Sequence, residues 1–319
     1  MNTLAICIPT YKRPKMLQRC IESAFISAKG VPLKIFISDD SVSEINSEVI
    51  RDLQEKFKEI YWHRNEANLG IDLNIQKALS ISDCDYNWII GEDDLFLPEA
   101  IFQIFNKIQN KSYPFIYSNY QYVDETCTKV LGVAINSLSE GEQDVNRFIS
   151  NYLWAIGFIG ACLIHRKSWE DTDGEKYKDT YFTHVGRILD MLESQKMLYI
   201  SALPAVSNRA QGEDTFTWKK DSFGVFFGFE KMCRVAAERN LLLKDSIVVA
   251  SNNYRSQFSY LSLKTTFRLR SEGAFDLQQY KKYISHSDIE LFRKVWLLFL
   301  ALAPRQIIKL FARIYYAYK

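Results

Sequence analysis

The sequence lacks the features that mark zinc-binding, disulfide-bonded, secreted and membrane-spanning proteins. Its six cysteines are widely spaced and none forms a C-x-x-C pair, so neither a zinc site nor a disulfide framework is expected, and a reducing compartment is favoured. The N-terminus enters an apolar pattern at once, without the charged region and cleavage site of a signal peptide. No apolar run approaches the ~20 residues of a membrane-spanning helix. We therefore expect a cytoplasmic protein.

Two further absences limit the possible ligands. No G-x-G-x-x-G follows the first apolar run, which argues against a dinucleotide-binding Rossmann domain. The formal net charge is only +2, so nothing in the overall charge points to nucleic acid as a partner. The 319 residues are 47% hydrophobic, which is enough for one large domain or two small ones with a buried core.

Apolar runs and helical patterns alternate over the first 120 residues. The runs that predict strands cover residues 3–9, 33–38, 60–63, 86–90 and 115–117. Between them, apolar residues recur at helical spacing, and Pro14 and Pro98 suit the first turns of two helices. Because the connections are short, this order predicts an α/β fold with a mostly parallel sheet and helices on both faces.

Three consecutive acids, Glu92, Asp93 and Asp94, follow the fourth predicted strand. They therefore lie at the carboxyl end of a strand, where open α/β sheets bind ligands. Adjacent carboxylates at a buried edge repel one another, and burial raises that cost. A divalent cation removes it, since hard cations prefer carboxylate oxygens. The acids predict a metal site, and a solvated acidic turn before the next helix is the alternative.

Four polar clusters end four of the predicted strands. They read I-P-T-Y-K-R at 8–13, S-D-D-S at 38–41, R-N-E-A-N-L-G at 64–70 and G-E-D-D at 91–94. In this order and spacing, roughly the first 120 residues resemble a family-2 glycosyltransferase with the GT-A fold. The last two motifs are most similar to the branch that builds bacterial O-antigen and capsule, including abequosyltransferase-like members.

The resemblance implies a site for a nucleotide-sugar donor. The matching positions are Pro9, Tyr11, Arg13, Asp39, Asp40, Arg64, Asn68, Gly70 and Asp93. Tyr11 would stack on the base, and Asp40 would hydrogen-bond a pyrimidine imino group. Arg13 and Arg64 would reach the nucleotide or its phosphates. A helix N-cap is the alternative role for Asp39 and Asp40.

The resemblance also implies a bound Mg²⁺ or Mn²⁺. The metal motif of the family, of the D-x-D type, is matched by Glu92, Asp93 and Asp94, with glutamate at its first position. Asp94 is the expected direct ligand, and Asp93 is expected to contact ribose or a metal-bound water. The role of Glu92 stays open.

Residues 126–215 are expected to form the acceptor half of a catalytic domain that spans residues 1–215, with residues 1–125 as its nucleotide-sugar half. Residues 157–165 read as an apolar strand, which resembles the segment that passes under the sugar and acceptor in this family. Candidates for the general base are His184 and Asp179, although His184 also suits a hydrogen-bonded core position. The polar loop that starts at Arg209 holds three candidate acceptor contacts: Gln211, Asp214 and Trp218. Trp218 would stack on a sugar or, alternatively, anchor the loop by packing.

The C-terminal third reads as helical. Residues 216–288 form one predicted helical region and residues 289–319 a second. From residue 291 onward the chain carries six basic residues and no acid, interleaved with Trp, Phe, Ile and Tyr, and Pro304 divides it into two helices. Such basic amphipathic helices suit an anionic membrane surface. A helix packed on the domain or at an oligomer interface is the alternative.

These observations predict an enzyme that moves a sugar from a nucleotide-diphosphate donor to a hydroxyl of a lipid-linked, lipopolysaccharide-type or other cell-surface glycan. The resemblance implies a metal-dependent, inverting transfer at the inner face of the bacterial plasma membrane. Two alternatives are a non-catalytic glycan-assembly partner and a sugar nucleotidyltransferase. The second normally has a Gly-rich loop after its first strand, which this chain lacks.

Overall fold

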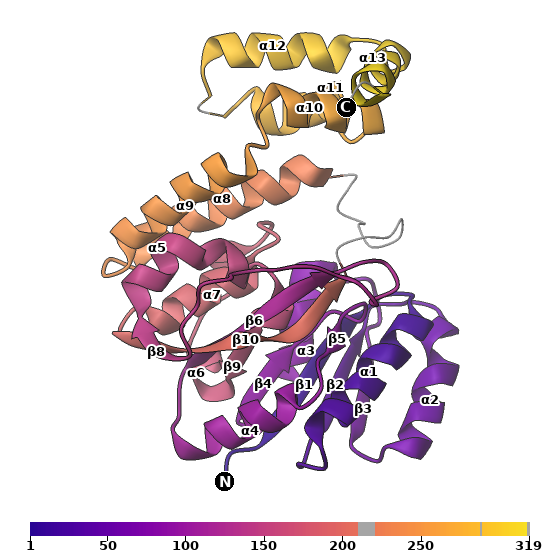
Figure 1. The fold of residues 1–319 in the computed structure, drawn as a ribbon, viewed down its shortest axis with the longest axis vertical. Coiled ribbons are helices and arrows are strands. Elements are labelled where there is room, and N and C mark those ends of the chain that lie inside the picture. The colour runs from indigo at the N-terminus through magenta and orange to yellow at the C-terminus, as the bar shows by residue number, and fades with distance from the viewer. Residues whose placement is uncertain (210–220, 288, 318–319) are drawn as a thin grey trace.

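The computed structural model describes residues 1–209, 221–287 and 289–317 (Figure 1). Its strands are β1 (Leu4–Thr10), β2 (Lys34–Asp39), β3 (Ile60–Arg64), β4 (Tyr86–Ile89), β5 (Leu95–Phe96), β6 (Phe115–Val123), β7 (Val130–Val133), β8 (Gly141–Asp144), β9 (Cys162–His165) and β10 (Met197–Arg209). Its α-helices are α1 (Pro14–Ala28), α2 (Ser47–Lys56), α3 (Ile71–Ser80), α4 (Ala100–Asn110), α5 (Val145–Ile156), α6 (Arg166–Glu170), α7 (Thr183–Leu192), α8 (Ser222–Arg239), α9 (Lys244–Phe258), α10 (Leu263–Glu272), α11 (Leu277–Gln279), α12 (Leu291–Leu302) and α13 (Arg305–Ala317). Short 3-10 or π turns are η1 (Glu44–Asn46), η2 (Ile159–Ala161), η3 (Glu175–Tyr177) and η5 (Tyr280–Ile284).

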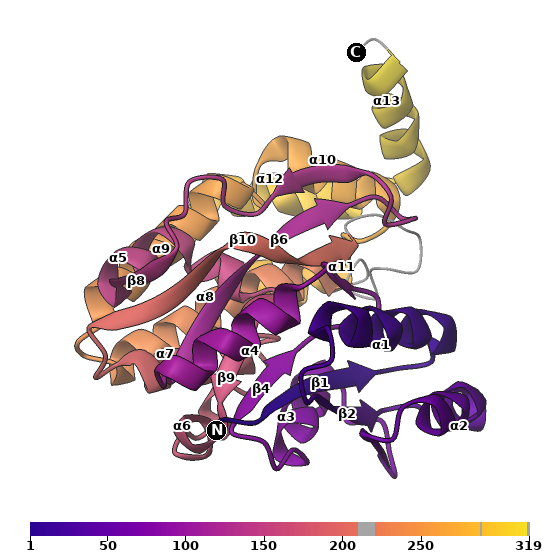
Figure 2. The same ribbon diagram turned by 60° about the horizontal axis from the view of Figure 1, so that its bottom comes forward.

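The first half of the sheet is parallel, as the sequence predicts. β3, β2, β1 and β4 are neighbours in that order, and each pair runs parallel. The chain steps outward from β1 to β3 and then returns to β4 on the other side of β1. Right-handed crossovers in opposite directions place helices on opposite faces. Accordingly α1 packs with α4 on one face, and α3 packs against β1 and β2 on the other (Figure 2).

The second half of the sheet is mixed. β9 lies antiparallel between β4 and β6, and β10 runs parallel to β6 but antiparallel to β5 and β8. The α/β class is confirmed, with a sheet that is mixed beyond β4. The strand expected at 157–165 begins only at Cys162, because residues 159–161 form the turn η2. There the carbonyl oxygen of Gly160 accepts a hydrogen bond from Nε1 of Trp88 at 2.9 Å instead of joining a strand ladder.

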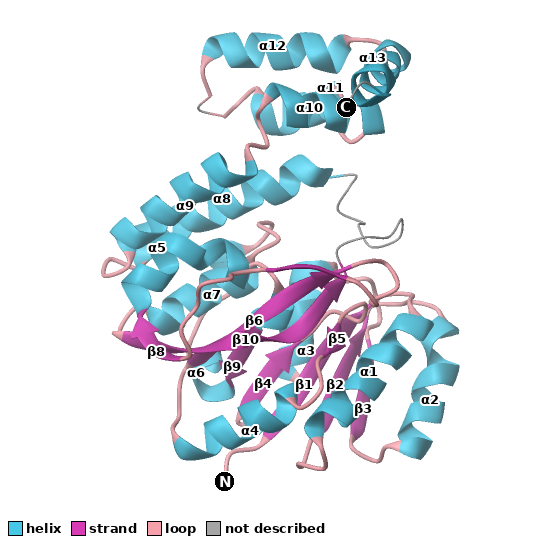
Figure 3. Cartoon of the chain, viewed as in Figure 1, coloured by secondary structure: helices cyan, strands magenta, loops and turns pink. Residues whose placement is uncertain are grey.

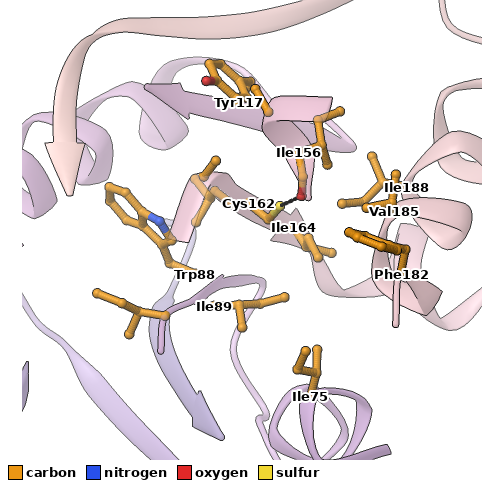
Figure 4. Close-up of a cluster of buried hydrophobic side chains, with 14 of the residues drawn as sticks. Ile75, Trp88, Ile89, Tyr117, Ile156, Cys162, Ile164, Phe182, Val185 and Ile188 are labelled. Atoms are coloured by element: carbon orange, nitrogen blue, oxygen red, sulfur yellow. Dashed lines mark hydrogen bonds between the residues drawn. The ribbon is translucent and has the colours of Figure 1, made fainter. Parts of the chain in front are cut away.

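The hydrophobic core joins the two halves of the sheet. Side chains from α3, β4, β6, α5, β9 and α7 converge on it (Figure 4). Trp88 and Ile89 of β4 are fully buried there beside Cys162 and Ile164 of β9. Ile75 of α3 belongs to this core, so α3 is fixed to the sheet.

The C-terminal region is helical, as expected. α8 packs with α9, and α9 packs on α5 beside the sheet. α10 to α13 form a further layer that lies farthest from the sheet (Figure 3). α12 ends at Leu302 and α13 begins at Arg305, so the break falls at Pro304 as predicted. Within the described ranges, no helix combines the length and apolar character needed to cross a membrane.

Candidate functional site

A cavity of about 720 Å³ opens at the carboxyl ends of β1 and β4. The loop before α3, the turn after α5 and the end of β10 close its other sides. Nine of the residues predicted from the sequence line it: Pro9, Tyr11, Arg13, Asp40, Asn68, Gly70, Asp93, Asp94 and His184. The strand ends therefore meet in one place, which we call the donor cavity.

The three acids lie at the floor of the donor cavity among two arginines. Nη1 of Arg13 lies 3.0 Å from Oδ2 of Asp93 and 3.5 Å from Oε1 of Glu92. Nη2 of Arg209 lies 3.9 Å from the same oxygen of Asp93. Arg13 follows β1 and Arg209 ends β10, so segments far apart in sequence hold guanidinium groups at one carboxylate. Guanidinium groups in such a place suit phosphate oxygens.

Burial makes ionisation of the outer two acids costly. Burial, followed by the charge of Asp93, raises the pKa of Glu92 to about 7, although Arg13 opposes the shift. The same two causes raise the pKa of Asp94 well above its ordinary value. Asp94 is only 4% exposed. A cation in this place would remove the repulsion that otherwise favours the protonated acids.

The residues present fit a divalent cation that is shared with a ligand. In the ranges that the structure describes, no group of three or more His, Cys, Asp or Glu side chains is arranged to hold a metal alone. Mg²⁺ commonly takes one or two carboxylates and completes its shell with water and substrate phosphates. Gly91 leaves space beside the two carboxylates, because a Cβ at this position would lie 3.1 Å from Oδ2 of Asp94 and 3.2 Å from Oδ1 of Asp93.

Asp40 organises the loop that precedes α3. Its Oδ1 accepts hydrogen bonds from the backbone N–H of Leu69 at 2.8 Å and from Nδ2 of Asn65 at 3.0 Å. Its Oδ2 accepts the backbone N–H of Gly70 at 3.0 Å. Gly70 has a φ of +78°, which favours glycine at this position. Asp40 thus both lines the donor cavity and fixes its wall, without capping α2.

Two predicted donor residues point elsewhere. Asp39 is fully buried, and its Oδ1 accepts hydrogen bonds from the backbone N–H of Ser41 at 2.9 Å and from Nδ2 of Asn46 at 3.0 Å. It therefore stabilises the turn after β2; it neither lines the cavity nor caps a helix. Arg64 ends the edge strand β3 and pairs with Glu44 at the surface, outside the donor cavity.

The two candidates for the general base occupy different surroundings. His184 is 2% exposed, and its Nε2 lies 3.2 Å from the carbonyl oxygen of Ile156. Burial lowers the pKa of His184 to about 4, so the ring is neutral near pH 7. This is the hydrogen-bonded core position that the sequence left open. Asp179 is exposed and lines a second cavity, which adjoins the first.

Sequence reasoning missed several residues of the donor cavity. Phe158 and Ile159 line it from the turn after α5, and Asn208 lines it from the end of β10. Nδ2 of Asn208 lies 3.3 Å from Oδ1 of Asp94. The sequence did contain a signal for Asn208. Asn208 and Arg209 form a polar pair at the end of an apolar stretch, directly before the polar loop. The candidate acceptor contacts Gln211, Asp214 and Trp218 lie outside the described residues.

The comparison with protein families identifies the family of this chain. Residues 5–171 match the model of glycosyl transferase family 2. The chain belongs to glycosyl transferase family 2. The match includes the ends of β1, β2, β3 and β4, so the resemblance drawn from the four motifs is confirmed.

Individual glycosyltransferases of this kind resemble parts of the chain. An abequosyltransferase, RfbV of Salmonella typhimurium, is 31% identical over 100 residues, which cover 31% of this chain and 30% of that protein. An uncharacterised glycosyltransferase of Methanocaldococcus jannaschii is 28% identical over 124 residues, which cover 38% of this chain and 43% of that protein. Each match spans less than half of the relative.

Solved structures share the fold over almost the whole chain. A crystal structure of residues 1–349 of S. aureus TarS superposes with a TM-score of 0.62 and 12% identity, and covers 98% of this chain and 91% of that one. Other crystals of the same TarS fragment contain UDP or UDP-GlcNAc. Together with the family match, the superposition confirms the predicted GT-A fold with its C-terminal helices.

Proposed function

We propose that this chain is a glycosyltransferase that moves a sugar from a nucleoside-diphosphate donor to a hydroxyl of a lipid-linked or cell-surface glycan. The observation that carries the proposal is the buried acid turn 92–94 between Arg13 and Arg209 at the floor of the donor cavity. Membership of family 2, the likeness to an abequosyltransferase and the nucleotide-sugar complex of a protein with the same fold support it.

The donor would lie along the ends of the parallel strands. Tyr11 at the end of β1 offers a partly exposed ring to a base, and Asp40 lies beside it on the same wall. The diphosphate would lie towards Arg13 and Arg209, whose guanidinium groups face Asp93. A Mg²⁺ or Mn²⁺ held by Asp94 would neutralise charge on the departing nucleoside diphosphate.

The reaction itself is a displacement at the anomeric carbon. The acceptor oxygen forms the new bond as the bond to the diphosphate oxygen breaks, with inversion, and the acceptor proton passes to a base. We assign that base to Asp179, because it is exposed in a cavity that adjoins the donor cavity. His184 is almost fully buried, and its ring nitrogen Nδ1 is enclosed by the surrounding residues. His184 therefore supports the site through its contact with Ile156.

The C-terminal helices would hold the enzyme at the inner face of the plasma membrane. Large apolar side chains of α12 and α13 are exposed, among them Phe292, Phe299 and Phe311. Basic residues, including Arg293 and Lys309, lie between them on the same helices. Apolar and basic groups together suit the headgroup layer of an anionic bilayer, where a lipid-linked acceptor would be found.

A panel of nucleotide sugars tests the function. One donor should raise the melting temperature in the presence of Mn²⁺ and slowly release free nucleotide without an acceptor. Stabilisation follows RT ln(1 + [L]/Kd), or about 2.7 kcal/mol at a hundredfold excess over Kd. Stabilisation without nucleotide release from any donor would favour the non-catalytic assembly partner instead.

A further inference from the structure

The structure contains a second cavity, of about 1020 Å³, next to the donor cavity. The first turn of α3, the segment before α7, the helices α8 and α9 and the turn η5 enclose it. Its volume is at the upper end of the range for small-molecule sites. The two cavities share Gly70, Ile71 and Tyr181, so the second one opens directly beside the donor cavity.

The wall between the two cavities is fixed by hydrogen bonds on both sides of Tyr181. Oδ2 of Asp72, in the first turn of α3, accepts the backbone N–H of Tyr181 at 3.0 Å. Tyr181 has a φ of +63°, which is unusual for a tyrosine and is held by this contact. The hydroxyl of Tyr181 donates to Oδ2 of Asp221 at 2.7 Å, and the hydroxyl of Tyr283 donates to the same oxygen at 2.7 Å. The segment before α7 is therefore tied to α3, to the start of α8 and to η5.

The chemistry of the second cavity suits a ligand rich in hydroxyl groups. Its wall carries acids, bases and an amide: Glu175, Lys178, Asp179, Arg234, Glu238 and Asn252. Sugar hydroxyls both donate and accept hydrogen bonds, so they can use groups of either charge. The rings of Phe227 and Tyr283 also line the cavity and are nearly parallel, with centroids 6.0 Å apart. Aromatic faces of this kind pack against the apolar faces of sugar rings.

The position of the second cavity indicates how a bound ligand would be oriented between the donor cavity and α12. One end adjoins the donor cavity at Tyr181, and Ile289 lies in the wall near the start of α12. The first two residues of α12, Leu291 and Phe292, are 77% and 83% exposed. A ligand with a polar and an apolar part would therefore find charged and amide side chains within the cavity and exposed apolar side chains beyond it.

We propose that the second cavity binds the oligosaccharide part of an amphiphilic acceptor. The hydroxyl that receives the sugar lies at Tyr181, near Asp179, and the lipid part leaves beside Ile289 towards α12. This assignment rests on the proposed glycosyltransferase function and adds the path of the acceptor.

Two neighbouring valines of α9 provide a matched test. Val248 and Val249 are 46% and 45% exposed, but Val248 lines the second cavity and Val249 does not belong to its wall. Octyl glycosides of several hexoses serve as soluble acceptors. Val248→Trp should raise the KM for the acceptor about tenfold, equivalent to about 1.4 kcal/mol of lost binding. Val249→Trp should leave it unchanged, and both variants should release nucleotide from the donor alone at the wild-type rate.

Amide hydrogen exchange gives a second readout that does not need turnover. Octyl glycosides should slow exchange in residues 174–183 and 224–234 of the wild-type protein but not of Val248→Trp. Equal acceptor KM values for the two variants, or no protection of these segments, would overturn the proposal. Absence of nucleotide release by the wild-type protein would instead count against the glycosyltransferase function, and the exchange experiment would still decide whether the cavity binds glycosides.

Discussion

Oδ1 of Asp94 accepts the backbone N–H of Arg209 at 3.1 Å, across 115 residues of sequence. This bond ties the acid turn after β4 to the end of β10, and Nδ2 of Asn208 lies 3.3 Å from the same oxygen. Because one oxygen of Asp94 is held by the protein, the orientation of the whole carboxylate is fixed. A carboxylate fixed in this way is suited to meet a cation without a large loss of side-chain entropy.

Asp94→Asn tests the role of this carboxylate. Asparagine keeps the size and can still accept the N–H of Arg209, so the fold should survive while the negative charge is lost. We expect stabilisation by Mn²⁺ with a nucleoside diphosphate to disappear, and sugar transfer with it. Asp83→Asn is the control, because Asp83 is exposed and pairs with Lys34 ahead of β4. Normal turnover by Asp94→Asn at saturating Mn²⁺ would show that the metal assignment is wrong.

Asp40 and Asp39 are adjacent but should respond differently to substitution. Asp40→Ala removes the acceptor for the N–H groups of Leu69 and Gly70 and the carboxylate that lines the donor cavity. Binding of a free nucleoside diphosphate should weaken by about 1–3 kcal/mol, the usual loss for a hydrogen bond to a charged group. Asp39→Asn should leave this affinity unchanged, because Asp39 faces the turn that follows β2. Titration calorimetry compares the two, and equal losses would contradict the division of roles.

The first half of the fold could be predicted from the sequence because the parallel strands of this half are buried. Such strands appear as apolar runs, and the polar residues after them must share one edge of the sheet. Arg64 shows the limit of this reasoning. It also follows an apolar run, but its side chain pairs with Glu44 at the surface instead of lining the donor cavity, because β3 is an edge strand of the described sheet. Strand order depends on pairings between distant segments, which local pattern does not contain.

The second half of the site was less predictable for a related reason. The turn at 159–161 depends on Gly160 meeting Trp88 of β4, a contact across 72 residues. The burial of His184 depends on the packing of α7 in the core, and a single histidine in an apolar stretch does not reveal its partner. The second cavity is formed by helices and turns from separate stretches of the chain, so no motif marks it.

His184 should make the stability of the protein depend on pH. Its pKa is about 4 in the folded protein and 6.5 ordinarily, because burial disfavours the charged ring. Between these values the unfolded chain binds a proton that the folded chain does not, so acidification favours unfolding. The free energy of unfolding should fall with decreasing pH from about 6.5 to 4, by up to about 1.4 kcal/mol per pH unit from this group.

Urea unfolding at about pH 7 and about pH 5, on either side of the ordinary histidine pKa, measures this effect. His184→Gln keeps a donor for the carbonyl oxygen of Ile156 but does not titrate, so its stability should change less between the two pH values. Glu92, whose raised pKa acts in the opposite direction, is present in both proteins and cancels in the comparison. The same change in stability for both proteins would show that His184 is not held neutral by burial.

Asp179→Asn separates acceptor chemistry from donor binding. Loss of the base should reduce transfer by about 10²–10⁴-fold, the usual contribution of general base catalysis. The affinity for the nucleoside diphosphate should not change, because Asp179 lies outside the donor cavity. Asp173→Asn, a substitution of another exposed acid before α7, is the control. Transfer at the wild-type rate by Asp179→Asn would remove Asp179 as the base.

The exposed apolar face of α12 and α13 should bind anionic membranes. Burying apolar surface in a headgroup layer contributes about 25 cal/mol per Å², and each nearby basic residue adds about 1 kcal/mol. We therefore expect the protein to sediment with vesicles that contain an anionic lipid, and less so at high salt, which screens the basic residues.

Replacing exposed phenylalanines of α12 and α13 is a sharper test than deleting the two helices. Deleting residues 289–319 would also remove the contact between Arg270 and the carbonyl oxygen of Ala303. The variant instead replaces Phe292, Phe299 and Phe311 with serine, since these side chains are 83%, 68% and 58% exposed. Vesicle binding and transfer to a lipid-linked acceptor should fall, while donor binding and transfer to a soluble glycoside should persist. Equal sedimentation of the variant and the wild-type protein would show that these helices serve packing or oligomer contacts instead.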